Sequence, residues 1–205
     1  MILETVVVGA LESNCYVLAL KECGSAIIID PGAEEHKIRK VLDTHKLKPA
    51  LVINTHGHYD HIGADDKFGV AVYIHKLDAA MLKDPMRNLS GLFSLAYGVK
   101  SEVKTLEEGQ VIAQDGIELK VLHIPGHTPG GIALVLTKPD GHIVFTGDTL
   151  FCQGIGRSDL EGGDGELLVR CIREKLLVLP PDTVVYPGHG PQTTIEEEKR
   201  ENPYL

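Results

Sequence analysis

Apolar residues in the first half of the chain recur in short runs between turn residues, which is the pattern of buried strands. The strands predicted in this way are residues 3–8, 16–20, 26–29, 51–54 and 70–74. Residues 34–45 place Ile38, Val41 and Leu42 on one face at helical spacing, so we predict a helix there. Two further helices are predicted over residues 60–68 and 77–83.

The second half of the chain, from about Val111, repeats this alternation. Strands are predicted over residues 117–123, 132–136, 142–145 and 183–186, and helices over residues 166–177 and 195–200. Residues 84–98 form the least regular segment, because Pro, Asn, Ser and Gly interrupt their apolar residues. Strands outnumber helices but alternate with them in both halves, which indicates an α/β fold with sheets flanked by helices.

Length and composition fit one globular domain over residues 1–205, with 43% apolar and 24% charged residues. The sequence shows neither an apolar run long enough to span a membrane nor a secretory signal at its start. A formal net charge of −9 argues against binding to nucleic acid. The four cysteines form no C-x-x-C pair, which favours reduced thiols in a cytoplasmic protein.

The strongest chemical signal is the run His-Gly-His-Tyr-Asp-His at residues 56–61, directly after a predicted strand. Neutral imidazole and carboxylate groups are the ligands of borderline divalent cations such as zinc. His56, His58, Asp60 and His61 therefore predict a metal site. A polar loop without a metal is the alternative.

Three more residues of the same types follow predicted strands later in the chain. They are His127 in Pro-Gly-His-Thr-Pro, Asp148 in Thr-Gly-Asp-Thr and His189 in Pro-Gly-His-Gly-Pro. Each stands on a turn just after a glycine, and catalytic groups concentrate on loops at the ends of strands. The repetition of this pattern favours one shared site.

In this order, the seven residues resemble the metallo-β-lactamase superfamily over essentially the whole chain. The stretches at 147–151, 156–159, 188–191 and 202–203 are most similar to its compact glyoxalase II-like branch, that is, to hydroxyacylglutathione hydrolase-like enzymes. The resemblance implies a four-layer αβ/βα sandwich with the site at one edge, between two sheets.

The resemblance also implies two divalent metal ions, zinc by preference, with iron or manganese suiting the same ligands. His56, His58 and His127 would bind the first ion, and Asp60, His61 and His189 the second, while Asp148 would bridge both. Asp60 and Asp148 are the expected catalytic carboxylates. Two ions held close together lower the pKa of a shared water, so that a bridging hydroxide can attack a carbonyl.

Other side chains are candidates for supporting roles. The family places a carboxylate at Asp30, where it would fix the ring of a ligand histidine, and a turn residue is the alternative. Tyr59 would project into the cleft or pack beneath the loop. Leu92 and Phe93, in the irregular segment 84–98, would line a substrate pocket or merely cover the core.

Two further features near the expected site are not interpreted as catalytic. Arg157 and Asp159 are interpreted as a structural pair beside the site. Cys152 is interpreted as a small packed thiol, with an approach to the metals as the alternative.

The leading hypothesis is a binuclear metal-dependent hydrolase that cleaves a thioester, of the type S-2-hydroxyacylglutathione. A mononuclear iron persulfide dioxygenase of the same fold is the main alternative. It would use mainly His56, His127 and Asp148, and the complete second ligand group favours the hydrolase. A metal-binding module without catalysis is the third hypothesis.

The sequence departs from full glyoxalase II enzymes after its last histidine. In those enzymes a C-terminal helical domain supplies basic groups for the carboxylates of glutathione. Only sixteen residues follow His189 here, so glutathione recognition is not carried over.

Overall fold

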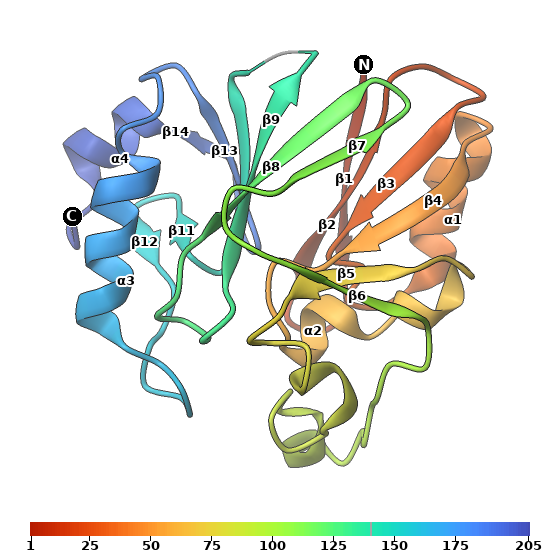
Figure 1. The fold of residues 1–205 in the computed structure, drawn as a ribbon, viewed down its shortest axis with the longest axis horizontal. Coiled ribbons are helices and arrows are strands. Elements are labelled where there is room, and N and C mark those ends of the chain that lie inside the picture. The colour runs from red at the N-terminus through yellow and green to blue at the C-terminus, as the bar shows by residue number, and fades with distance from the viewer. Residues whose placement is uncertain (140) are drawn as a thin grey trace.

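The computed structural model describes residues 1–139 and 141–205, and two six-stranded sheets dominate it (Figure 1). The first sheet has the order β1-β2-β3-β4-β5-β6, antiparallel as far as β3 and parallel from there on. Its strands are β1 (Ile2–Val8), β2 (Ser13–Ala19), β3 (Ser25–Ile29), β4 (Lys48–Ile53), β5 (Val72–His75) and β6 (Val103–Leu106).

The second sheet has the order β14-β13-β10-β9-β8-β7 and is antiparallel except where β10 pairs with β13. Its strands are β7 (Val111–Gln114), β8 (Ile117–His123), β9 (Ile132–Lys138), β10 (Ile143–Gly147), β13 (Val184–Pro187) and β14 (Thr193–Thr194). A small hairpin, β11 (Leu150–Phe151) and β12 (Gly154–Ile155), follows β10.

Helices lie on the outer faces of both sheets and in the connections (Figure 1). The α-helices are α1 (Glu35–Thr44), α2 (Tyr59–Ile62), α3 (Gly165–Cys171) and α4 (Ile195–Glu201). Helix α3 continues as the π-helical turn η4 (Ile172–Leu176). Three 3₁₀ turns complete the set: η1 (Asp65–Lys67), η2 (Met81–Lys83) and η3 (Ser90–Phe93).

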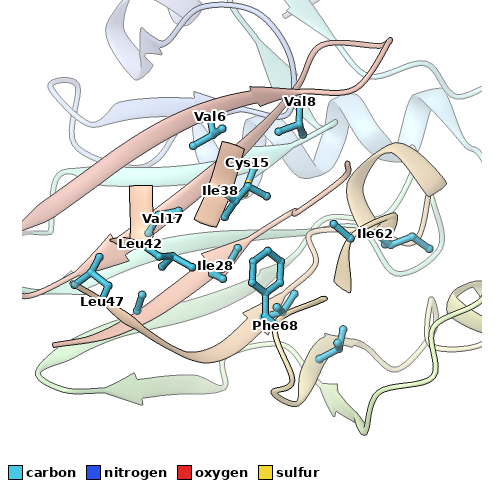
Figure 2. Packing of buried hydrophobic residues seen from close by; sticks show 14 of the residues in the cluster. Val6, Val8, Cys15, Val17, Ile28, Ile38, Leu42, Leu47, Ile62 and Phe68 are labelled. Carbon is cyan, nitrogen blue, oxygen red and sulfur yellow. The ribbon is translucent and has the colours of Figure 1, made fainter. Parts of the chain in front are cut away.

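Strand residues alternate between two cores, because successive side chains of a strand point to opposite faces. On β2 and β3, Val17 and Ile28 pack outward against Ile38 and Leu42 of α1, as Figure 2 shows. Their neighbours on the same strands face the second sheet instead, as Leu18 does. Burial of both faces explains why these strands are apolar almost throughout.

The second sheet repeats this arrangement on the far side of the molecule. Phe145 of β10 belongs to the core between the sheets, whereas its neighbour Val144 packs outward with Leu168 of α3 and Ile195 of α4. The layers are therefore α1, first sheet, second sheet, and α3 with α4. This order confirms the predicted α/β fold, a four-layer αβ/βα sandwich.

Some predicted elements differ from the structure. The helix predicted over residues 77–83 is wrong, because residues 76–80 form turns with i to i+3 hydrogen bonds and only η2 is helical. The helix predicted over residues 60–68 is shorter, since α2 ends at Ile62. The described residues 1–139 and 141–205 contain no helix that is both long and apolar enough to cross a membrane.

Candidate metal centre

The seven residues predicted as metal ligands lie on four segments that follow strands of both sheets. His56 and His58 follow β4, and Asp60 and His61 lie on α2 just beyond them. The remaining three follow β8, β10 and β13 of the second sheet: His127, Asp148 and His189. Both sheets therefore contribute side chains to one edge of the sandwich.

The side-chain nitrogens and oxygens of these residues form three overlapping groups, with the atoms of each group within 4.8 Å of one another. The groups are His56, His58 and His127; His56, His61 and Asp148; and Asp60, His61 and His189. The first and third groups share no residue, and the middle group lies between them. The seven residues therefore form a cluster that can hold divalent metal ions.

Asp148 connects the two outer groups through its two carboxylate oxygens. Its Oδ2 lies 3.6 Å from Nε2 of His127, in the first group. Its Oδ1 lies 3.3 Å from Nε2 of His61 and 3.6 Å from Nε2 of His189, in the third group. A carboxylate with one oxygen toward each group has the geometry of a bridging ligand.

Backbone carbonyls fix which nitrogen of two histidines faces the site. Nδ1 of His127 donates a hydrogen bond to the carbonyl of Arg157 at 2.7 Å. Nδ1 of His189 donates to the carbonyl of Leu11 at 2.9 Å. The Nε2 lone pair of each neutral ring therefore points into the site.

Asp30, at the end of β3, orients two more rings. Its Oδ2 accepts hydrogen bonds from Nδ1 of His61 at 3.0 Å and from the Thr55 hydroxyl at 2.6 Å. The oxygen of that hydroxyl lies 3.2 Å from Nδ1 of His56, so it can accept a hydrogen bond from this ring nitrogen. Asp30 thus lies where the sequence analysis expects it, and Thr55 extends its effect to a second ligand.

The inward-facing atoms match the requirements of a divalent cation. His58 Nδ1 and His127 Nε2 are 3.0 Å apart, and the Nε2 atoms of His61 and His189 are 3.3 Å apart. Lone pairs at such distances repel unless a cation or a proton lies between them. In addition, His56 Nε2 and Asp148 Oδ1 are buried and make no hydrogen bond with the described part of the chain. Nitrogen and carboxylate donors of this kind fit zinc or iron.

The two sides of the site differ in their affinity for protons. Burial lowers the pKa of His58 to about 3. Burial also opposes the charged form of His61, but Asp148 and Asp60 outweigh it and raise the pKa of that ring well above its usual range. A cation can therefore bind His58 without displacing a proton, whereas at His61 it must displace one.

Asp78 is a buried residue near the site that the sequence analysis did not identify. Its Oδ2 accepts hydrogen bonds from the Gly57 amide at 3.1 Å and the Thr128 hydroxyl at 2.7 Å, and its Oδ1 accepts from the Gly130 amide at 2.6 Å. Gly57 stands between two ligands, and Thr128 follows His127. One carboxylate thus ties the loop after β4 to the loop after β8.

The residue before His189, Gly188, has to be a glycine for a steric reason. A Cβ atom on Gly188 would lie 2.2 Å from Oδ1 of Asp148, far inside van der Waals contact. Any other residue at this position would push the loop of His189 away from the bridging carboxylate. The glycine in this motif is therefore part of the metal site and not only of a turn.

Two cavities adjoin the metal-ligand residues, each through a different ligand. The larger, of about 510 Å³, is lined by Asp60 and by the side chains of Leu11, Tyr59, Phe93 and Leu95, among others. The smaller, of about 210 Å³, is lined by His58 together with residues such as Met81, Met86, Arg87 and Pro129. Each cavity therefore reaches a ligand of a different group.

The residues predicted to form a substrate pocket divide between cavity and surface. Tyr59 and Phe93 line the larger cavity, with ring centroids 5.0 Å apart. The prediction for Leu92 is wrong: this side chain is 64% exposed and lies outside the set of lining residues. Successive residues of a 3₁₀ turn point about 120° apart, so η3 directs only one of the pair into the cavity.

Arg157 and Asp159 form the expected pair, with two hydrogen bonds of 2.8 Å each at the surface. The interpretation of Cys152 as a packed thiol is wrong, because this side chain is exposed, and it belongs to none of the three ligand groups. The small hairpin β11–β12 turns Cys152 outward at its tip. All four cysteines are free.

Comparison with known proteins agrees with this architecture. The hydroxyacylglutathione hydrolase GloC of Haemophilus influenzae is 36% identical over an alignment of 211 positions, which covers 100% of this chain and 98% of that protein. The crystal structure of the BLEG-1 B3 metallo-β-lactamase matches with a TM-score of 0.91 and 35% identity, covering 100% of this chain and 99% of the other.

A second solved structure, TTHA1623 in a di-iron-bound form, matches with a TM-score of 0.83 and 38% identity, covering 98% of this chain and 100% of the other. The family model for the metallo-β-lactamase superfamily matches residues 8–189, a span that includes all seven candidate ligands. The chain therefore belongs to the metallo-β-lactamase superfamily.

Proposed function

We propose that this protein is a binuclear metal-dependent hydrolase that cleaves a thioester such as an S-2-hydroxyacylglutathione. The observation that carries the proposal is the position of Asp148, whose two oxygens face two separate histidine groups. The similarity to GloC, a hydroxyacylglutathione hydrolase, supports the substrate class. In this proposal each outer group holds one ion, and Asp148 binds both.

Two bound divalent ions would lower the pKa of a shared water and polarise the substrate carbonyl. The chain itself supplies a rigid frame for this chemistry. Asp30 holds His61, and the carbonyls of Arg157 and Leu11 hold the rings of His127 and His189. Ligands fixed in this way need no reorganisation when a substrate binds. We propose zinc as the preferred metal, and the di-iron form of TTHA1623 supports iron as a substitute.

A mononuclear iron persulfide dioxygenase is the competing proposal, since it would need mainly the first group with Asp148. The third group argues for the hydrolase. His61 is fully buried and hydrogen-bonded to Asp30, and Asp60 also accepts a hydrogen bond from the Ser13 hydroxyl at 3.1 Å. An enzyme with one ion would not require this second, well-ordered set of ligands, which supports the hydrolase.

The test combines metal analysis with two activity assays on the same preparation. Metal-loaded protein is given S-lactoylglutathione and smaller thioesters, while oxygen consumption is followed separately with glutathione persulfide. A penicillin belongs in the panel because of the similarity to BLEG-1. We expect about two metal ions per chain and thioester hydrolysis without oxygen uptake. One ion per chain with full activity, or oxygen consumption with the persulfide, would overturn the proposal.

A further inference from the structure

The larger cavity beside the metal site differs in chemistry from the site itself. Of its twelve lining residues, Asp60 and Glu34 are charged and both are acidic, and no Lys or Arg is among them. The other lining side chains are apolar or aromatic, with Leu11, Tyr59 and Phe93 as examples. An occupant of this cavity therefore meets mainly apolar surface and no lining cation from the protein.

The composition of the lining indicates which part of a thioester, the acyl group or the thiol, can bind in this cavity. The thiols that carry acyl groups in cells, such as glutathione and coenzyme A, hold carboxylates or phosphates, which need Arg or Lys partners. The lining residues of this cavity supply no such partner, since Lys37 is paired with Glu34 at 2.7 Å and Asp60 is a proposed metal ligand. The acyl end of the substrate has no such charge requirement, so it suits this cavity better.

The size of the cavity also indicates a larger acyl group than lactoyl. A volume of about 510 Å³ lies within the range of small-molecule sites. A two- or three-carbon acyl group would leave most of it to water. Only a longer acyl chain, or an acyl group that contains a ring, would cover the aromatic and branched side chains that line the cavity.

Resting on the proposed function, we infer that this cavity binds the acyl group of the thioester, and that the preferred acyl group is uncharged and apolar, either aliphatic or aromatic. Asp60 lines the cavity and would bind the second ion, so the carbonyl would lie at the metals while the acyl chain extends along the contacting rings of Tyr59 and Phe93. A carboxylate at the end of the chain would find no Lys or Arg in the lining, because the nearby Lys37 is paired with Glu34 at 2.7 Å, and would therefore bind poorly.

The experiment varies the acyl group on one uncharged thiol, N-acetylcysteamine. The thioesters carry acetyl, butanoyl, hexanoyl, phenylacetyl and succinyl groups, and kcat/KM is measured for each. Burial of a methylene is worth up to about fourfold. We expect kcat/KM to rise by about two- to fourfold per methylene from acetyl to hexanoyl, and succinyl to be poorer than butanoyl by at least about tenfold.

Three variants in one segment separate the cavity from general effects. Phe93→Ala and Leu95→Ala remove lining side chains, so the rise in kcat/KM with chain length should flatten. Leu92→Ala is the matched control, because Leu92 is 64% exposed, close to the 57% of Phe93, but does not line the cavity. Glu34→Gln keeps the acceptor for the Gly9 amide and should improve succinyl relative to butanoyl.

A binding measurement tests the inference independently of catalytic turnover. The matching ketones, with a methylene between sulfur and carbonyl, cannot be hydrolysed, and calorimetry on metal-loaded protein gives their affinities. Hydrolysis with no dependence on chain length, unchanged in Phe93→Ala, would overturn the inference and leave the hydrolase intact. If no thioester is hydrolysed, the proposed function fails. Ketone affinities that rise with chain length would then still support the cavity assignment, and flat affinities would refute it.

Discussion

Asp148 is the residue on which the proposed chemistry depends most directly. Its oxygens reach toward His127 on one side and toward His61 and His189 on the other. In this arrangement each oxygen faces a different ligand group, so the one carboxylate can contact both proposed cations. An amide in its place presents only one oxygen and no charge, so the effect of losing the bridge can be measured without a large change of shape.

We therefore expect Asp148→Asn to bind fewer than two metal ions and to lower kcat/KM by roughly a hundredfold or more. His36→Ala, at an exposed position of α1, serves as the control and should retain both metals and activity. Elemental analysis and thioester hydrolysis on the same samples provide the measurement. Equal losses in the two variants would mean that the bridge is misassigned.

Asp78 acts through backbone and hydroxyl groups, not on a metal. The Asp78→Asn substitution replaces one carboxylate oxygen by an amide nitrogen, which cannot accept a hydrogen bond. At least one of the buried hydrogen bonds from the Gly57 amide, the Thr128 hydroxyl or the Gly130 amide is therefore lost. An unmet buried group costs about 1–3 kcal/mol, and residues that support ligands typically change metal affinity by about 10–100-fold.

Thermal unfolding of the metal-free protein and metal titration of the folded protein test the two parts separately. Asp43→Asn, at an exposed position of α1 where the carboxylate makes no hydrogen bond with the described residues, is the matched control and should change stability by less than about 0.5 kcal/mol. A variant with normal metal affinity but reduced stability would limit Asp78 to a role in folding.

At the scale of elements, the ends of β5 and β8 are joined by two stacked histidines. The rings of His75 and His123 lie 4.0 Å apart at an interplanar angle of 14°. His75 is buried, and burial, aided by His123 and Lys76, lowers its pKa to about 4. The folded protein therefore keeps His75 neutral at pH values where the unfolded chain protonates it.

This difference makes stability depend on pH. Between about pH 6.5 and 4 the unfolded state binds the extra proton, so the free energy of unfolding falls as the pH falls. His75→Gln should reduce that slope by at most one proton, and His36→Gln, at an exposed position, should not change it. Denaturant unfolding with a chelator present gives the slopes without interference from metal loss. Identical slopes in all three proteins would refute the assignment.

The sequence predicted elements well where local pattern and tertiary environment agree. Strands β1, β3 and β8 and helix α4 lie within two residues of the predicted bounds, because their apolar runs and the Thr194–Glu197 capping box are local signals. Strand β6 was missed, since Val-Lys-Thr-Leu offers only two apolar residues at the edge of a sheet.

Prediction of the site shows the same division. Histidines in a dense motif can be recognised from the sequence alone, and the side chains of all seven proposed ligands lie together in the structure. Asp78 was not visible, because a single aspartate in Leu-Asp-Ala-Ala has no neighbouring partner and its three hydrogen bonds come from residues 21 to 52 positions away. Leu92 and Phe93 differ only in which way one short turn directs them.

At the scale of the whole molecule, the metal site joins the two sheets. Four of the seven ligands follow β4 of the first sheet, and three follow strands of the second. Asn14 of β2 adds a direct link, because its side-chain amide donates to the carbonyls of Pro187 and Gly190 around His189 at 3.0 and 2.9 Å. Ions bound here would oppose separation of the sheets.

Removal of metal should therefore destabilise the whole fold and not only the loops. A ligand present at a thousandfold excess over its Kd stabilises the folded state by about 4 kcal/mol per site. We expect a chelator to lower Tm by several degrees and added zinc to restore it, as measured by calorimetry. The same Tm with and without chelator, in protein shown to contain metal, would contradict a site shared by the two sheets.

His189 is the last of the seven proposed ligands in chain order, which matters for the order of events during synthesis. A nascent chain that has reached Gly188 carries six of the seven proposed ligands, yet it lacks both this imidazole and the strand β14 that pairs with β13. Up to that moment the growing polypeptide can offer two of the three ligand groups, His56 with His58 and His127, and His56 with His61 and Asp148, but not the group of Asp60, His61 and His189. The third ligand group is therefore completed after the other two, and a chain that has not yet reached His189 cannot form the two-ion site of the proposed function.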